Sequence, residues 1–510
     1  MFVGLAIAAA VPGASGARVR AQTPPTRQLS VEEAVRLALE QNLGVRIERL
    51  NPQLQDFVIA ETRSSWVPTL TSSFLGDHAN TPATNIFAGG QTSIIQNEVS
   101  TGIGLSQTLP TGGNYAVAWN SDHITSTNIF NSFNPQLDSS VSLSVTQPLF
   151  KNFKIDDIRH RLQGNEADRT EADYALQAAV VQTTRAVKNA YWDLTYQIDN
   201  TNAQQQSLDL SKQLLADNER RVAAGTMASL DIVEAQSEVA RNEEGVIVAE
   251  AGIRQAEDRL RVLVLDPSAP DFWTVSLTLG DQAVFQPRDI DLDGAVRHAL
   301  SDRADVQTVK NTIAHDDLDV RYYKNQTLPE VDAHVSYTSN AVGGSLLSPI
   351  NSFPIIGTRT IVGSQGFGSV LGDVLSSTFP TWSAGVTFAY PLGTSQSEAR
   401  LARARLQSSQ ADLQRRNLEL EVVTEVRDAA RQVQTNQKRV DSAGAARELA
   451  EKRLEAEQRK YTAGVETSFF VFQAQRDLSQ ARTDEARAKA DYNKSLADFE
   501  AVQLAPLNPR

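Results

Sequence analysis

Residues 461–475 read YTAGVETSFFVFQAQ, and residues 222–236 read VAAGTMASLDIVEAQ. Both stretches carry an Ala-Gly pair that is followed eleven residues later by an Ala-Gln pair, and the two copies are offset by 239 residues. Glycine adopts positive φ without steric cost and commonly ends helices. Each stretch therefore predicts a short break between two helices, and the likeness of the two stretches predicts an internal repeat.

Proline placement agrees with these two breaks. Residues 149–266 and 392–505 contain no proline, whereas the segments before them contain nine and eight. Proline disrupts helix interiors, so both intervals are free to form long helices. A helix of about 69 residues in each interval spans about 100 Å at 1.5 Å per residue. The predicted helices are the long ones at 154–222 and 393–461, the returning ones at 226–265 and 465–505, and the leading ones at 31–65 and 292–327.

The leading helices provide a second match between the halves. LSVEEAVRLAL at 29–39 matches IDLDGAVRHAL at 290–300, at an offset of 261. Ser30 and Glu33 have the spacing of a capping box, and Asp291 is placed to cap the equivalent helix. In the long helices, apolar residues at helical spacing predict coiled-coil seams: Val187, Tyr191 and Leu194 in the first, and Val426, Val433 and Val440 in the second.

The segments between the helices are poor in charge. Residues 66–150 contain four charged side chains and residues 331–391 contain three, although charged residues make up 21% of the chain. Apolar and small polar residues alternate in them, as at 99–105 and 382–390. Strands near ten residues with this pattern are typical of outer-membrane strands with one face on lipid. The alternative is a soluble β-sandwich, whose outer face normally carries Lys and Glu.

Three features of these segments remain to be placed. Residues 77–96 and 339–380 are rich in Gly, Ser, Asn and Thr, and we expect them to be outward loops. Residues 109–113 predict a hairpin, which either adds strands to the first half or lengthens one.

Composition excludes several classes of protein. The formal net charge of −13 over 510 residues argues against nucleic acid as a partner, which requires a basic surface. The absence of cysteine excludes disulfides, thiolate metal sites and a cysteine nucleophile. Residues 1–22 have the apolar core and small-residue cleavage sites of a secretory signal. The alternative for this stretch is a buried N-terminal strand.

Motifs for catalysis and cofactor binding are absent from the sequence. It contains no P-loop, no H-E-x-x-H and no G-x-S-x-G. Asp289, Asp291 and Asp293 resemble the start of an EF-hand loop, but Leu300 stands where a bidentate Glu is needed. His315-Asp316-Asp317 has no partner at ligand spacing and is expected on a solvated helix face. We therefore predict no catalytic residue, no metal, no cofactor and no enzyme activity.

Together, the duplicated motifs resemble the TolC-like outer-membrane efflux protein family, also called the outer membrane factors. The matching features are the duplicated Ala-Val-x-x-Ala-Leu openings, Leu328-Pro329, Gln147-Pro148-Leu149-Phe150, and above all Tyr461 to Gly464 followed by Phe472-x-Ala474-Gln475. The resemblance implies a mainly α fold with β: a long antiparallel α-helical coiled-coil barrel continuous with a transmembrane β-barrel, with two internal repeats per chain and three chains. It implies a signal peptide at 1–22, a first repeat at 23–266, a linker at 267–289, a second repeat at 290–505 and a tail at 506–510.

The same resemblance implies a function and partners. The chain is expected in the bacterial outer membrane with its helical tunnel in the periplasm, as the passive exit duct of a tripartite efflux or type I secretion system. Its partners would be two further copies in a homotrimer, a periplasmic adaptor, an inner-membrane pump and outer-membrane lipid. The adaptor would dock at two tips, Ala224-Gly225-Thr226 and Ala463-Gly464-Val465. The alternative is a trimeric envelope coiled-coil structural protein or adhesin without transport.

The resemblance also implies a gate at the tips, in which Tyr461 and Asp231 match a tyrosine and an aspartate whose hydrogen bond links neighbouring tip helices in the closed state. Three positions depart from the family. Glu466 stands where the family has a basic residue, and Phe470 and Gln473 stand at the two positions of an acidic constriction. We therefore predict an apolar constriction at Phe470. The alternative is that Phe469, Phe470 and Phe472 only pack the tip coiled coil.

Overall fold

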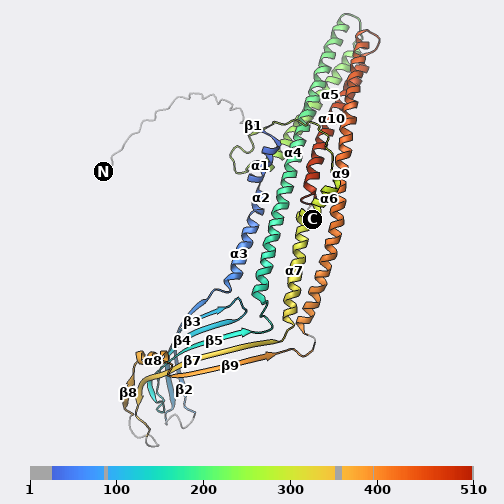
Figure 1. Ribbon diagram of the computed structural model, residues 1–510. Helices are drawn as coiled ribbons and strands as arrows, with labels where there is room; N and C mark the ends of the chain where they lie inside the picture. Colours follow the sequence, from blue (N-terminus) through green and yellow to red (C-terminus); the bar gives the residue numbers. More distant parts are fainter. Residues whose placement is uncertain (1–25, 85–89, 351–358, 394, 508–510) are drawn as a thin grey trace, which may run out of the picture. The chain divides into compact units, whose positions relative to one another are not determined.

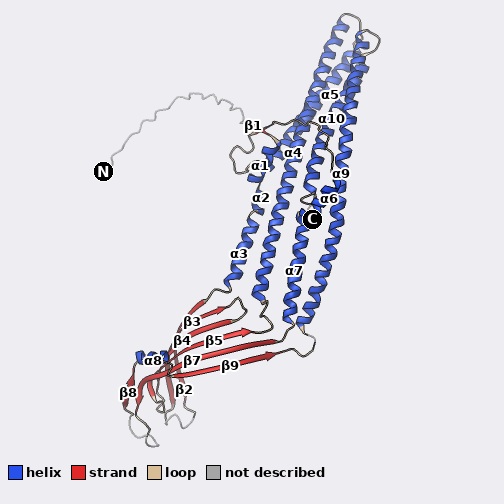
Figure 2. Cartoon of the chain, viewed as in Figure 1, coloured by secondary structure: helices blue, strands red, loops and turns tan. Residues whose placement is uncertain are grey.

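The computed structural model describes residues 26–84, 90–350, 359–393 and 395–507 (Figure 1). The predicted signal at 1–22 lies outside them. Long helices and one large sheet make up the described chain (Figure 2), which divides into two compact units. The first unit contains residues up to 46, 179–292 and 426–502, and the second contains 47–178, 293–425 and 503 onward. Each unit therefore draws on both halves of the sequence.

The four long helices confirm the prediction from the proline-free intervals. α4 (Asp157–Ala223) and α9 (Gln396–Thr462) have 67 residues each, and α5 (Leu230–Val264) and α10 (Ser468–Val502) have 35 each. Their ends differ from the predicted ends by no more than four residues. Among the described helices, none has an 18-residue stretch that is apolar enough to cross a membrane.

The predicted apolar seams are buried in the first unit. Val187, Tyr191 and Leu194 of α4 are at most 1% exposed and pack against Leu260 of α5 and residues of α1 (Val31–Gln41). Val433 and Val440 of α9 form a separate cluster with residues of α10. Burial of such side chains contributes about 1.5–3 kcal/mol each. The coiled-coil spacing read from the sequence therefore marks the true core of this unit.

A short pair of parallel strands contributes Leu29 and Leu277 to the core of the first unit. β1 (Thr26–Leu29) pairs with β6 (Ser276–Leu279). The Tyr191 hydroxyl donates to the Leu29 carbonyl at 3.1 Å and accepts from the Asp281 backbone N–H at 3.0 Å. Residues 267–289, predicted as a linker, thus contain a strand that holds the start of the described chain.

The prediction of two unbroken leading helices is wrong. The first is divided into α1, α2 (Leu43–Glu48) and α3 (Leu50–Ser64), and the second into α6 (Leu292–Asp302) and α7 (Ala304–Gln326). Asn42 is extended, and its side-chain oxygen accepts hydrogen bonds from the N–H groups of Gly44 and Val45, which caps the next helix. Arg303 is also extended, and its buried guanidinium pairs with Asp305 and Glu425. Asn42 and Arg303 are separated by the same 261 residues as the leading motifs.

The second unit contains an antiparallel sheet. Its strands are β2 (Thr69–Pro82), β3 (Ser93–Thr108), β4 (Asn114–Ser126), β5 (Phe133–Pro148), β7 (Glu330–Leu347), β8 (Ile361–Gln365) and β9 (Phe379–Ala389). The order is β2-β3-β4-β5-β7, and both β8 and β9 pair with β7. Apart from β8, the strands have 11 to 18 residues, so the predicted length near ten fits β9 and is too short for the others. Pairing continues into the predicted loop 77–96, as at Ala79 opposite Gln96.

The hairpin at 109–113 adds strands to the first half. The Leu109 N–H donates to the Gly113 carbonyl at 2.7 Å, and Gly112 has a φ of +81° that favours glycine. β3 and β4 are joined by this turn, so the first half contributes four strands and the second half contributes β7 and β9 with the short β8.

The predicted outward loops are only partly loops. β2 extends to Pro82 and β3 begins at Ser93, and residues 85–89 lie outside the described chain. Within 339–380, α8 (Phe367–Leu375) places Val370 and Val374 one turn apart against Ala341 of β7. The Ser339 hydroxyl donates to the Val374 carbonyl at 2.6 Å. The glycine and serine content of this segment predicts a loop, so composition does not reveal the helix. The apolar face of α8 packs on the sheet.

Candidate functional site at the two helical tips

The two tips have the same backbone geometry. After α4, Gly225 has a φ of +73° and its N–H donates to the Val222 carbonyl, while the Thr226 N–H donates to the Arg221 carbonyl. After α9, Gly464 has a φ of +75°, and Gly464 and Val465 donate to the equivalent carbonyls of Tyr461 and Lys460. This pair of bonds defines a Schellman motif, which ends a helix by satisfying its last carbonyls. The positive φ explains why glycine occupies both positions.

All six predicted docking residues are exposed. They are Ala224, Gly225, Thr226, Ala463, Gly464 and Val465. A Cβ atom built on Gly225 or Gly464 would have no neighbouring atom within 4 Å. A Cβ atom at either position therefore clashes with none of the described residues, and its internal cost is the strain of a left-handed backbone, about 1–2 kcal/mol. The described residues leave both glycine surfaces free for a partner.

The two hairpins share one apolar core beneath the tips. Leu214 of α4 and Ala235 of α5 pack with Tyr461 of α9 and with Val471 and Phe472 of α10, and all five are at most 6% exposed. In Figure 1 the α4–α5 and α9–α10 connections lie at the same end of the first unit. The hairpins are therefore packed as one body rather than as two independent arms.

Tyr461 and Asp231 are linked through a residue that the sequence reading missed. The Tyr461 hydroxyl donates to the side-chain oxygen of Asn218 at 2.6 Å, and the Asn218 amide donates to the backbone carbonyl of Asp231 at 3.2 Å. Asn218 is fully buried. The available signal was its position four residues after Leu214, on the apolar face of α4. Within one chain, the Asp231 carboxylate is not the acceptor for Tyr461.

Arg221 also holds Tyr461. Its guanidinium lies 4.3 Å from the centre of the Tyr461 ring, and Nη1 donates to the Tyr461 carbonyl at 3.4 Å. Burial raises the pKa of Tyr461, and the charges of Asp217 and Asp231 raise it further, whereas Arg221 acts against them. The phenol is therefore protonated at neutral pH and serves as a hydrogen-bond donor.

Glu466 takes part in a local ion-pair group. Lys460 Nζ lies 3.1 Å from a carboxylate oxygen of Glu466 and 3.1 Å from one of Glu457. Two hydrogen bonds raise the pKa of Lys460, and the one to Glu466 has a larger effect than the one to Glu457. Glu466 is thus paired with a basic residue of its own hairpin.

The three phenylalanines at the second tip have different environments. Phe472 is 4% exposed in the shared core, whereas Phe469 and Phe470 are 51% and 43% exposed and form an edge-to-face pair. Within one chain, Phe472 is thus the only one of the three that is buried in this core. Gln473 is half-buried. Lining of a constriction by Phe470 stays a prediction.

The second tip also contains buried polar atoms without partners among the described residues. They are Ser468 Oγ, Gln475 Oε1, and one oxygen each of Glu457 and Glu466. Gln475, with Arg221 and Tyr461, lines a groove of about 470 Å³ between the hairpins. An unsatisfied buried polar atom costs about 1–3 kcal/mol, so this arrangement is held less firmly than an apolar core.

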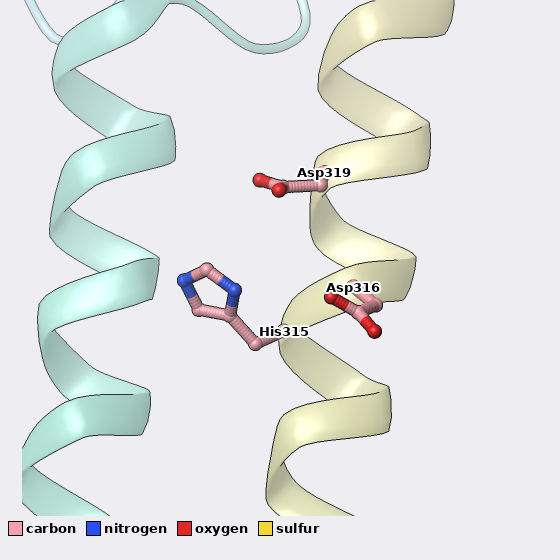
Figure 3. Close-up of side chains that lie close together, drawn as sticks. All are labelled: His315, Asp316 and Asp319. Atoms are coloured by element: carbon pink, nitrogen blue, oxygen red, sulfur yellow. The ribbon is translucent and has the colours of Figure 1, made fainter. Parts of the chain in front are cut away.

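One cluster of possible metal ligands lies away from the tips. His315, Asp316 and Asp319 of α7 are half-buried, and their ligand atoms lie within 4.8 Å of one another (Figure 3). The expectation that His315-Asp316-Asp317 lies on a solvated face without a ligand partner is therefore wrong for His315 and Asp316. The signal for the cluster in the sequence is the four-residue spacing of His315 and Asp319, which places them on one helix face.

Comparisons with known proteins agree with this architecture. The family described as outer membrane efflux protein matches residues 116–264 and 295–502. The Campylobacter jejuni CmeC outer membrane channel is 15% identical, with 93% of this chain and 85% of that chain covered and a TM-score of 0.62. The open state of the Neisseria gonorrhoeae MtrE outer membrane channel is 14% identical, with 97% and 94% covered and a TM-score of 0.63. The Vibrio cholerae outer membrane protein VceC is 14% identical, with 93% and 96% covered and a TM-score of 0.62. No curated protein sequence matches the chain.

Proposed function

The chain belongs to the outer membrane efflux protein family, and we propose that it is the passive exit duct of a tripartite efflux system. As a member of that family it is an outer-membrane efflux channel and not an enzyme. The proposal adds that the sheet lies in the outer membrane, that the helices form a periplasmic tunnel, and that the tips dock an adaptor. The observation that carries it is the pair of equivalent, exposed glycine tips on one packed core.

Docking at the tips is supported by their surface. A helix hairpin of an adaptor can approach closely where glycine leaves the backbone uncovered. Ala224 and Ala463 precede the two glycines, and their small side chains add little bulk beside the exposed backbone. Each chain has two tips of the same geometry and so offers two similar sites. A ring of such chains could bind several adaptor molecules.

A homotrimer is supported first by the open edges of the sheet. In the described chain β2 pairs only with β3, and β9 pairs only with β7, so each has a free edge. Backbone groups on a free edge in lipid cost several kcal/mol each, which favours closure with other copies. Successive strands are antiparallel from β2 to β9, so β9 of one copy meets β2 of the next in antiparallel orientation. Six long strands per chain then give 18 in a trimer, in place of the twelve of the simple family pattern.

Two apolar stripes in the second unit support the same assembly, one along α2 and α3 and the other on α9. Ile47, Leu50, Leu54 and Phe57 follow one face along α2 and α3, and all are at least 55% exposed. Leu406, Leu413 and Leu420 recur every seven residues on α9 and are at least 65% exposed. Heptad spacing of exposed leucine is the pattern of a coiled-coil seam that lacks its partner. Neighbouring copies are the proposed partners for both stripes.

The internal repeat and the domain boundaries are part of the proposal. Equal lengths of α4 and α9, and of α5 and α10, favour duplication of 23–266 as 290–505 around the 267–289 segment, with a tail from 506. The matching interruptions at Asn42 and Arg303 favour it as well.

The gate is proposed at the second tip. Tyr461, with Asn218, Arg221 and Asp231, is the group that holds the two hairpins together, and Phe470 and Gln473 are the proposed constriction. Glu466 is proposed to keep Lys460 away from the pore. The unpartnered atoms of Ser468 and Gln475 support a tip that changes its packing when the adaptor binds.

Transport energy is proposed to come from an inner-membrane pump, since the sequence has no nucleotide-binding motif. Type I secretion uses the same kind of adaptor-docked duct and remains within the proposal. Fractionation of cells and single-channel recording in lipid bilayers test it. An outer-membrane protein with stable conductance is expected. Outer-membrane protein that forms no conducting pore would favour the structural or adhesin alternative.

A further inference from the structure

We propose that His315, Asp316 and Asp319 bind a divalent transition-metal cation of the Zn²⁺ type where α7 faces α4. The three side chains come from a single turn of α7, and their ligand atoms lie within 4.8 Å of one another. One imidazole with two carboxylates is a donor set that suits Zn²⁺ and its neighbours in the first row. His315 and Asp319 stand four residues apart, which places them on the same helix face.

The orientation of His315 supports the site. In Figure 3 its ring lies between the ribbons of α4 and α7, and its carboxylate neighbours come from α7. A Cβ atom on Gly164 of α4 would lie 3.1 Å from His315 Nε2. Glycine inside a helix costs about 0.5–1 kcal/mol relative to alanine, and here it makes room for this ring. The other ring nitrogen, Nδ1, is on the side of the carboxylates (Figure 3).

A second histidine positions the Asp319 carboxylate. His160 of α4 makes a 2.6 Å hydrogen bond from Nε2 to Asp319 Oδ1, and its ring stacks on Tyr322 with 4.2 Å between ring centres. Metal ligands are commonly oriented by such partners outside the coordination sphere. His160 is therefore a positioning residue, and it connects the cation site to the neighbouring helix.

The charges around the site favour a cation. Three carboxylates, those of Asp316, Asp317 and Asp319, fall within four successive residues of α7. Within the described chain, the side chains of His315 and Asp316 make no hydrogen bond and no ion pair with another residue. A divalent cation would neutralise these carboxylates and give both side chains a partner.

The test is a Zn²⁺ titration of the full-length protein, solubilised in detergent and purified without a histidine tag. Binding is followed by calorimetry, and Co²⁺ absorption reports the ligand type. One Zn²⁺ per chain is expected. His315→Ala and Asp316→Asn should each remove this binding, and His160→Gln should weaken it about 10–100-fold. His298→Ala is the matched control, because His298 and Asp302 have the same spacing on α6 at 3.5 Å without a third ligand.

Two results would overturn the proposal. One is the absence of one-to-one binding in the wild type, and the other is binding that survives both His315→Ala and Asp316→Asn. Circular dichroism and size-exclusion chromatography of each variant establish that lost binding does not come from lost folding. Asp316→Asn keeps the size of the side chain, so it tests the ligand even if His315→Ala disturbs packing.

Discussion

Tyr461 donates its hydroxyl hydrogen to the amide oxygen of Asn218, across the contact between the two hairpins. The acceptor is a neutral amide, so the bond is worth about 0.5–1.5 kcal/mol rather than the larger value expected for a carboxylate. Because Asn218 reaches the backbone of Asp231, the link does not depend on the aspartate side chain. This relationship changes which substitutions are expected to open the tip.

Tyr461→Phe is expected to loosen the tip by about 0.5–1.5 kcal/mol per chain, because a buried hydrogen bond is lost. Higher single-channel conductance and greater sensitivity of cells to large antibiotics should follow. Asn218→Ala should have the same effect. Asp231→Ala is the matched control, since it keeps the carbonyl that Asn218 uses. If Asp231→Ala opens the channel as much as Tyr461→Phe, the carboxylate has a role that one chain alone does not reveal.

Substitutions at Gly225 and Gly464 should separate backbone strain from adaptor docking. Asparagine tolerates the left-handed conformation, so Gly464→Asn should keep the tip structure while covering the proposed docking surface. Loss of adaptor binding with an intact oligomer is the expected result, measured by co-purification and size-exclusion chromatography. Gly464→Asp and Gly225→Asp should abolish export in the same way. Normal export in all three variants would remove the tips from the docking site.

Phe470→Asp should leave the pore narrow and introduce block by multivalent cations, because carboxylates would then surround the constriction. The wild type should show little such block in bilayer recordings. Phe472→Ala provides the contrast: it removes a buried core side chain and should destabilise the tip by about 3–5 kcal/mol. Strong cation block of the wild type at low micromolar concentrations would mean that other acids line the pore.

Leu413→Asp and Phe57→Asp should weaken the oligomer, because each places a charge on an exposed apolar stripe. The measurement is the fraction of heat-modifiable oligomer in detergent at several protein concentrations. Gln414→Asp adds the same charge to the same turn of α9 on a different face and should leave the oligomer unchanged. A wild-type protein that is a stable monomer in detergent would contradict the assembly.

Asp316 has a raised pKa, which gives a pH-dependent prediction. A carboxyl whose pKa is higher in the folded state contributes most stability below its unfolded pKa, about 3.9 for aspartate, and that contribution is lost as pH rises through the folded pKa. Without metal, Asp316→Asn should therefore raise the melting temperature at pH 7 and have little effect near pH 3. Added Zn²⁺ should stabilise the wild type and not this variant. Equal melting temperatures at pH 7 would show that the charge on Asp316 is well solvated.

The long helices and tips could be predicted because their signals are local. Proline is excluded from a helix interior and glycine favours a positive φ, so the ends of α4 and α9 were found within three residues. The break at Arg303 could not be found in this way, because its extended backbone is stabilised by Glu425, more than 120 residues away. Asn218 was missed for a related reason. Its role depends on Tyr461 in the other half of the chain, and a single buried amide within a polar helix carries no local signal.

The pairing of β1 with β6 has a consequence for the order in which the chain folds. Thr26 pairs with Ser276, and the Val31 N–H donates to the Asp281 carboxylate, 250 residues later. Contacts so distant in sequence close a large loop, which is entropically costly and slow. The first strand therefore has no partner until residues 276–279 are available to it, and its docking is a late folding event. Until then its backbone groups and Leu29 are unprotected, so a chaperone that binds extended apolar segments has a clear target at Thr26–Leu29.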